Sequence, residues 1–264
     1  TDNLSSLNGG AVSLSASSSW KSLADMMGHN HASSYGGGVL MDSLGLASIY
    51  GSVFESNTAS CGGGLALMGP ILSDNSRCPI QYQDVIFFNN TALPDPLTFQ
   101  PQPGVIDSPG GGAAVFVSGS ANVLHHLGLR CSVNQFGAFL DNMGAYGGNV
   151  STSPYLIQAS GDEFDVGGYP GEVVRLNWTV VDTFFEPILT LQNMLIISHC
   201  EANCSQADAL GSTVNGSAFT EVIPIGPPST LSILTASSPF IFNLDVSPFQ
   251  TVLSLDCPPG MVFL

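Results

Sequence analysis

The feature that most constrains the fold is a phrase that recurs along the first half of the chain, an asparagine accompanied by a run of glycines. The asparagines of this phrase are separated by 27, 27, 33 and 44 residues: Asn3, Asn30, Asn57, Asn90 and Asn134. The clearest glycine runs are Gly36–Gly38, Gly62–Gly64 and Gly110–Gly112. A near-constant period of this size indicates a solenoid of stacked repeats.

The residues after each glycine run alternate between apolar and other side chains, which is the period of a β-strand. Val39 with Met41 and Leu65 with Leu67 are examples. A coil of this length cannot bury its own apolar face and must pack on the next coil. The sequence therefore predicts a parallel β-helix of about five coils, spaced by about 4.8 Å, with glycine corners and asparagine side chains bonded along the stack.

The repeat also resembles a known family. Phe54-x-x-Asn57 and Phe87-x-x-Asn90, each with a Gly-Gly-Ala/Val/Leu phrase, are similar to the polymorphic outer-membrane-protein repeat of bacterial surface proteins. The resemblance covers roughly residues 1–145. It implies a right-handed β-helix that lies outside the cell and serves adhesion or structure.

From about Tyr155 the pattern changes to short alternating strands separated by turn residues, which is typical of a β-sandwich. Residues 171–182 and 214–219 resemble immunoglobulin-like modules of long surface proteins, and 257–260 resembles the opening of a small cysteine-rich module. We expect a parallel β-helix over 1–150, an immunoglobulin-like β-sandwich over 151–257 and a tail or truncated module over 258–264. Residues 144–154 are expected to form the linker.

Charge excludes several classes of partner. Charged residues make up 9% of the chain and the formal net charge is −16, which argues against nucleic acid and anionic membranes as ligands. No apolar run reaches the 18 or so residues of a spanning helix, so we expect no membrane span. A neutral polar surface needs another source of solubility, and covalent glycans provide one.

Six Asn-x-Ser/Thr sequons occur, and the one at Asn3 is discounted because this residue is expected to lie inward on the asparagine stack. We expect N-glycans at the other five: Asn89, Asn149, Asn177, Asn203 and Asn215. A proline-rich insertion, Leu93 to Pro109, is expected to leave the stack as a loop, either O-glycosylated or a contact loop.

Six cysteines allow 15 full pairings and, together with the sequons, favour an oxidising compartment. The expected disulfides join Cys61 to Cys78 around one excursion and Cys200 to Cys204 around a small loop. Cys131 is open between a disulfide and a buried thiol. One Cys-x3-Cys spacing does not supply a zinc site.

Catalysis and metal binding find little support. His29 and His31 bracket Asn30, and residues 162–165 include three acidic side chains, but neither group has the spacing of a metal site. The four basic residues are scattered, and carboxylates do not recur at coil spacing as a polysaccharide lyase or hydrolase would need. We therefore expect no enzyme activity, no metal and no cofactor.

These observations favour a non-catalytic, extracellular structural glycoprotein. The edge strands at the end of a β-helix need a partner, so copies of the chain are expected to assemble head to tail or by strand donation into a fibril, appendage or cell coat. An adhesin or glycan-binding module, with the 93–109 loop as contact surface, is the alternative. A polysaccharide lyase or hydrolase is the second alternative.

Overall fold

A computed structural model gives the structure of the protein. It describes residues 3–5, 8–15, 18–42, 46–68, 80–97, 99–100, 107–119, 137–159, 165–201, 204–205, 208–225, 231–239 and 250–255. Every regular element in these ranges is a strand, and no helix occurs among them. The prediction of an all-β protein is confirmed.

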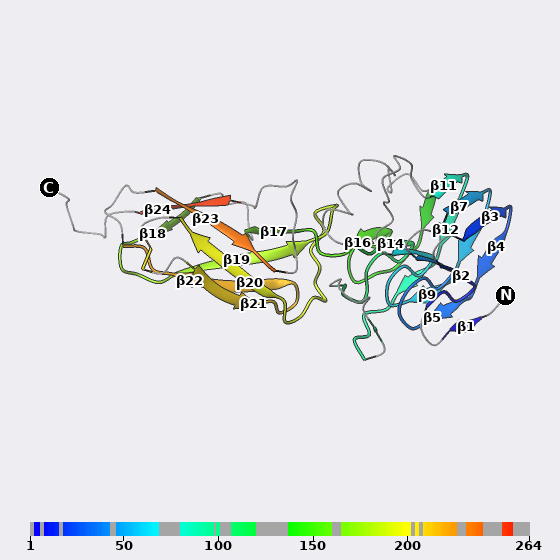
Figure 1. Cartoon of the computed structure of the whole chain (residues 1–264), viewed down its shortest axis with the longest axis horizontal. Helices are drawn as coiled ribbons and strands as arrows, with labels where there is room; N and C mark the ends of the chain where they lie inside the picture. Colours follow the sequence, from blue (N-terminus) through cyan, green and yellow to red (C-terminus); the bar gives the residue numbers. More distant parts are fainter. Residues whose placement is uncertain are drawn as a thin grey trace.

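Four parallel sheets form the first half of the molecule, on the right of Figure 1. The first contains β1 (Leu4–Ser5), β5 (His31–Ala32), β9 (Thr58–Ala59) and β13 (Thr91–Ala92). The second contains β2 (Val12–Leu14), β6 (Val39–Asp42), β10 (Leu65–Met68), β14 (Val115–Val117) and β16 (Val150–Thr152). The third contains β3 (Ser19–Leu23), β7 (Leu46–Tyr50) and β11 (Ile80–Gln83). The fourth contains β4 (Met26–Gly28), β8 (Val53–Glu55), β12 (Ile86–Phe88) and β15 (Ala138–Leu140).

Within each sheet, neighbouring strands come from successive passages of the chain, and equivalent positions of the repeat pair with each other. Val39 pairs with Leu65, Leu65 with Val115, and Val115 with Val150. We call the described residues from 3 to 152 the parallel stack. Its strands therefore place like residues directly over one another, so that one residue type can form a continuous column.

The interior of the stack is built from such columns. The rings of Phe54, Phe87 and Phe139 stack with centroids 4.8 and 5.5 Å apart and planes inclined by 17°. Leu65 and Leu67 are also fully buried in this interior. Aromatic rings at this separation add stabilisation to that of the buried area alone.

The corners of the coils recur in register. His29, Ser56, Asn89 and Asp141 all have positive φ, each one residue before an asparagine. Glycine is required at another corner because the next coil lies against it: a Cβ on Gly63 would come within 2.5 Å of the Thr91 carbonyl oxygen. The glycine runs therefore allow coils to approach closely.

The predicted linker over 144–154 is wrong in part. Residues 150–152 form β16, which pairs in parallel with β14 and extends the second sheet by one strand. The sequence there contains several glycines and serines, but the repeat places Val150 in the column of Val115. Parallel pairing thus continues to Thr152, and antiparallel pairing begins at Leu156.

The C-terminal unit, residues 155–255 where described, contains two mainly antiparallel sheets. The smaller has the order β17 (Leu156–Ala159), β19 (Val174–Val181) and β22 (Ser217–Val222). The larger has the order β18 (Asp165–Gly168), β24 (Gln250–Leu255), β23 (Leu231–Ser237), β20 (Leu195–Cys200) and β21 (Asp208–Ser212). Figure 1 shows these strands on the left, with β20 and β21 beside β22.

The two sheets share one apolar core. Leu176 and Trp178 of β19 belong to the same buried cluster as Ile196 of β20 and Leu234 of β23. Trp178 is fully buried and its indole N–H donates to Thr220 Oγ1 at 2.8 Å. The strand expected over 188–197 begins only at Leu195, while that expected over 240–246 lies outside the described residues.

Direct contacts join the stack to the C-terminal unit. Asp182 accepts a hydrogen bond from the Thr152 amide at 3.2 Å. The Thr190 hydroxyl donates to the Pro109 carbonyl at 2.6 Å and lies 2.8 Å from the Ser108 hydroxyl. The 107–109 end of the proline-rich insertion therefore lies at this junction.

Candidate functional site

An asparagine ladder runs along one edge of the stack. The amide group of Asn57 donates to Asn90 Oδ1 at 3.0 Å and to the Met27 carbonyl at 2.8 Å. Its own Oδ1 accepts from the backbone N–H and the side chain of Asn30, at 3.1 and 2.9 Å. All donors and acceptors of this buried amide are satisfied, which is the condition for keeping a polar group in a core.

Asn3 begins this ladder, with Nδ2 donating to Asn30 Oδ1 at 2.9 Å, and it is exposed as the last member at this end of the ladder among the described residues. At the other end the next member is Asn142, whose Oδ1 accepts from Asn90 Nδ2 at 3.0 Å. The sequence expectation was Asn134, which lies outside the described residues. The signal missed was Phe139-x-x-Asn142, the same phrase as Phe87-x-x-Asn90.

The N-terminal coil forms one edge of every sheet of the stack. β1, β2, β3 and β4 are each the last strand in their sheets, and each has one strand partner among the described residues. Three apolar side chains are exposed on this coil: Leu4 at 83%, Leu23 at 66% and Met26 at 63%. Edge strands with exposed apolar side chains are favourable sites for strand addition.

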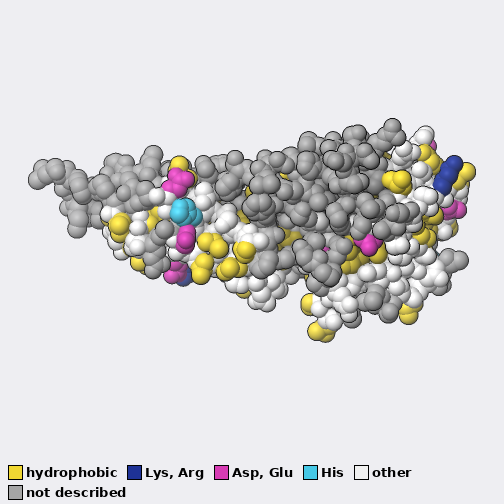
Figure 2. Space-filling view, viewed as in Figure 1, with side chains coloured by type: hydrophobic (Ala, Val, Ile, Leu, Met, Phe, Trp, Pro, Cys, Tyr) yellow, Lys and Arg dark blue, Asp and Glu magenta, His cyan; other side chains and the backbone are white. Residues whose placement is uncertain are grey.

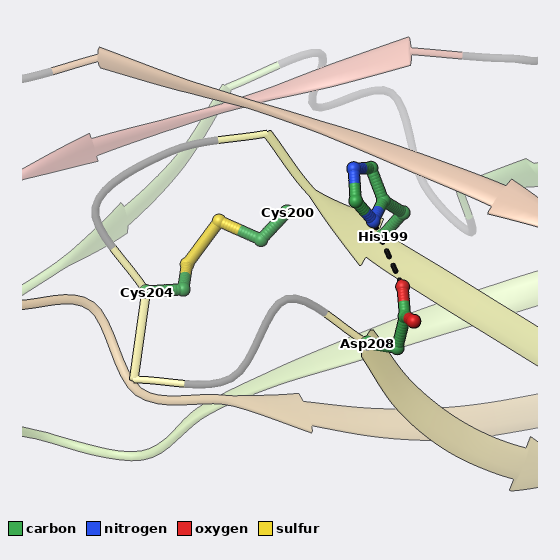
Figure 3. Close-up of a disulfide and its surroundings, with 4 residues drawn as sticks. All are labelled: His199, Cys200, Cys204 and Asp208. Atoms are coloured by element: carbon green, nitrogen blue, oxygen red, sulfur yellow. Dashed lines mark hydrogen bonds and ion pairs between the residues drawn. A yellow bond between two sulfur atoms is a disulfide. The ribbon is translucent and has the colours of Figure 1, made fainter.

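Cys200 and Cys204 form a disulfide with a Cα–Cα distance of 6.3 Å (Figure 3). Cys61 is a free, fully buried thiol, so the predicted Cys61–Cys78 disulfide is wrong. Cys78 and Cys131 lie outside the described residues. The side chain of Cys61 points into the interior of the coil. There its Sγ donates to the Ser108 carbonyl at 3.2 Å.

A buried polar cluster lies beside Cys61. The Asp107 carboxylate accepts hydrogen bonds from the hydroxyls of Tyr35 at 2.7 Å, Ser118 at 2.6 Å and Ser153. Burial raises the pKa of Asp107 in spite of these three donors. Burial, and then the neighbouring Asp107 charge, raise the pKa of the Cys61 thiol well above its usual range. This thiol is therefore a poor nucleophile, and the cluster joins the insertion to the stack.

Asp182 is the second buried carboxylate of the junction. Its Oδ1 accepts from the amides of Phe184 at 2.8 Å and Glu186 at 3.1 Å, while Oδ2 accepts from Thr152. Burial nevertheless raises the pKa of Asp182 to about 6. The junction between the two units therefore contains a group that titrates in mildly acidic solution.

Of the five expected glycosylation sites, four are described and all four are exposed. Asn89 occupies a corner and donates to Ser56 Oγ at 3.0 Å. Asn149 accepts from Asn142 at 3.3 Å, and Asn215, at a turn with positive φ, accepts from Gln192 at 2.8 Å. Asn177 lies on β19, and Asn203 lies outside the described residues. Glycosylation of these residues stays a prediction.

An open depression of about 620 Å³ lies over β21 and β22 on the outside of the C-terminal unit. It is lined by Arg175, Asp208, Ala209, Leu210, Phe219 and Glu221. His199 Nδ1 lies 2.8 Å from Asp208 Oδ1 at the same surface (Figure 3). Figure 2 shows apolar side chains grouped next to charged ones on this unit.

Metal ligands do not gather in the part of the chain that the structure describes, where no group of three or more His, Cys, Asp or Glu side chains has suitable geometry. His29 is an exposed corner residue and His31 is half-buried on β5. Residues 162–164 of the acidic segment lie outside the described residues. The described residues contain no helix that is long and apolar enough to cross a membrane.

Comparison with known proteins adds little. No protein-family model matches the chain, and no curated protein is significantly similar in sequence. Among solved structures, a β-glycosidase from Bacteroides vulgatus is similar over 40% of this chain, with a TM-score of 0.31 and 10% identity. The match covers 15% of that protein, so it carries no argument about fold or activity.

Proposed function

We propose that the protein is a non-catalytic, extracellular structural glycoprotein whose copies associate through the N-terminal coil of the stack. In this proposal the stack is a right-handed parallel β-helix and the C-terminal unit is an immunoglobulin-like β-sandwich. The in-register columns and the shared core of the two C-terminal sheets support this description. The Cys200–Cys204 disulfide supports an oxidising location outside the cell.

The observation that carries the proposal is the common edge of the four sheets. β1, β2, β3 and β4 end their sheets on the same coil, where Leu4, Leu23 and Met26 are exposed. Strand addition by a second copy would provide backbone partners for the edge and cover these side chains together. Repetition of this contact head to tail, or by strand donation to the next copy, would form a fibril, appendage or cell coat.

Electron microscopy and light scattering of the purified protein test this assembly. We expect elongated particles whose length increases with concentration, and we expect the double variant Leu23→Lys/Met26→Lys to remain monomeric, because charges on an edge oppose strand pairing. Leu97→Lys is the matched control, since Leu97 is 94% exposed on the insertion, away from the edge. Only single particles of the unmodified protein at high concentration, or equal assembly of the edge variant, would refute the proposal.

An adhesive function is the second candidate. The exposed Leu97 lies in the proline-rich insertion, where an apolar tip beside proline-restrained backbone suits a contact loop. Removal of residues 95–99 would then abolish binding to immobilised glycans or cells and leave particle length unchanged. Loss of assembly with retained binding would assign the loop to the fibril contact.

A further inference from the structure

The outward face of β19 and β22 brings a sequon and an aromatic ring together across two strands. Asn177 of β19 pairs directly with Phe219 of β22, and Arg175 pairs with Glu221 one step along. All four side chains are exposed, while the alternate residues of β19 point into the core. Directly opposed residues of an antiparallel pair have Cβ atoms about 4.5–5.5 Å apart, within reach of one sugar ring.

Phe219 is held in place although it is 57% exposed. The Arg175 guanidinium lies 5.7 Å from the ring centroid, and its NH2 group donates to Glu221 at 2.7 Å. The cation and the ion pair orient the ring at its Arg175 side. An apolar ring in this position, next to a modifiable amide, has a large area that a covering group would remove from water.

Asn177 also differs from the other described sequons. The side chains of Asn89, Asn149 and Asn215 each have a hydrogen-bond partner, and Asn89 and Asn215 have positive φ. Asn177 lies in a regular strand with negative φ, and its side-chain amide has no hydrogen bond within the described ranges. This amide is therefore both available for modification and placed by the sheet beside a ring.

We propose that the N-glycan on Asn177 packs back on the protein, with the apolar face of its first N-acetylhexosamine against the Phe219 ring. This inference rests on the glycosylation contained in the proposed function. Attachment forms the bond from Asn177 Nδ2 to the anomeric carbon and breaks the bond from that carbon to the phosphate oxygen of a lipid diphosphate donor. The amide proton is lost as the lipid diphosphate leaves.

The axial C–H groups of a pyranose form an apolar face, while its hydroxyls lie at the rim. Stacking on Phe219 therefore buries apolar area and leaves the hydroxyls directed outward, toward water and the charged groups of Arg175 and Glu221. The depression beyond Phe219, which Leu210 also lines, offers further surface to the next sugars. The glycan would thus cover an apolar patch that is otherwise in contact with water.

A double-mutant cycle tests the contact in protein secreted from a host that installs N-glycans. The four proteins are the unmodified chain, Asn177→Gln, Phe219→Thr and the double variant. We expect loss of the glycan to lower the Tm by roughly 2–4 °C more when Phe219 is present than when it is replaced. Threonine retains strand propensity, and Phe219→Leu serves as a second variant if Phe219→Thr does not fold.

Proton NMR detects the contact directly and does not depend on the stability of the protein. Protons of the first sugar on Asn177 should be shifted upfield by the ring current of Phe219, and the shift should disappear in Phe219→Thr. Asn89→Gln combined with Phe219→Thr is the matched control and should show no thermal coupling.

The outcomes separate this inference from the proposed function. A glycan on Asn177 with no coupling and no upfield shift overturns the packing and leaves the glycoprotein intact. An unmodified Asn177 with glycans on other sequons, detected by peptide mass analysis, also overturns it. Absence of glycans from every sequon overturns both the packing and the glycoprotein part of the function, whereas assembly is decided by the edge variants alone.

Discussion

The parallel stack and the C-terminal unit both bury β-strands in an apolar core, but they pair different kinds of residues to do so. In the stack, like residues lie over one another, as in the Phe54–Phe87–Phe139 column and the asparagine ladder. In the C-terminal unit, unlike residues meet across antiparallel strands, as Trp178 meets Ala218. A stack thus depends on repetition of a few positions, whereas a two-sheet core depends on many different long-range pairs.

The ladder is the feature whose loss should affect the two regions most unequally. Asn57→Ala removes an amide with four hydrogen bonds: the backbone N–H and side-chain amide of Asn30 lose their acceptor, and the Asn90 amide oxygen and the Met27 carbonyl each lose one donor. We expect a loss of about 4 kcal/mol in the free energy of unfolding of the stack. Urea unfolding followed by circular dichroism measures it.

Fluorescence of Trp178 in a Trp20→Phe background reports the C-terminal unit in the same experiment, and its transition should move less than that of the stack. Asn3→Ala is the matched control, because Asn3 is an exposed member of the same ladder, and we expect it to cost under about 1 kcal/mol. Equal losses for Asn57→Ala and Asn3→Ala would show that the ladder does not stabilise the stack.

The free energy of unfolding should depend on pH because of Asp182, which lies at the boundary between the two regions. The pKa of Asp182 is about 6 in the folded protein because of burial, against about 3.9 in an unfolded chain. Between these values the folded state binds more protons, so the stability from protonated Asp182 is complete below pH ~4 and lost as pH rises through ~6. The free energy of unfolding should fall by roughly 2–3 kcal/mol across this window.

Urea unfolding at pH 4.5 and pH 7 measures this dependence. Asp182→Asn should reduce the difference between the two pH values, because an amide does not titrate. Burial raises the pKa of Asp107 as well, so a pH dependence of the same sign should remain in this variant. An unchanged pH dependence in Asp182→Asn would contradict the assignment.

The covalent link in the C-terminal unit should have the smallest effect of the three. Cys200→Ser/Cys204→Ser opens a loop of sequence separation 4, for which loop entropy predicts a loss of about 2 kcal/mol. Differential scanning calorimetry should show the loss only in the transition of the C-terminal unit. A loss of the same size in the stack transition would mean that the two regions unfold together.

Local repetition made much of the stack readable in advance. Glycine corners and asparagines at one spacing indicate coils without knowledge of any distant contact, and the all-β class followed from the period-two pattern. The prediction of Asn134 as the next ladder residue missed Asn142, because the longer segment between Asn90 and Asn142 disturbs the period. Phe139-x-x-Asn142 nevertheless repeats the phrase. The prediction of a linker was also wrong at Val150, because the glycines and serines around this residue hide its place in the repeat.

The sequence by itself determined the strand periodicity, the outward position of Asn177 and the close cysteine pair, because each depends on residues near in the chain. Only the tertiary structure decided that Cys61 is a free thiol, that Asp107 and Asp182 are buried and that Phe219 lies beside Asn177. These depend on which distant strands pair and in what register. A shift of one residue would reverse the face of every side chain, and no local pattern specifies that choice.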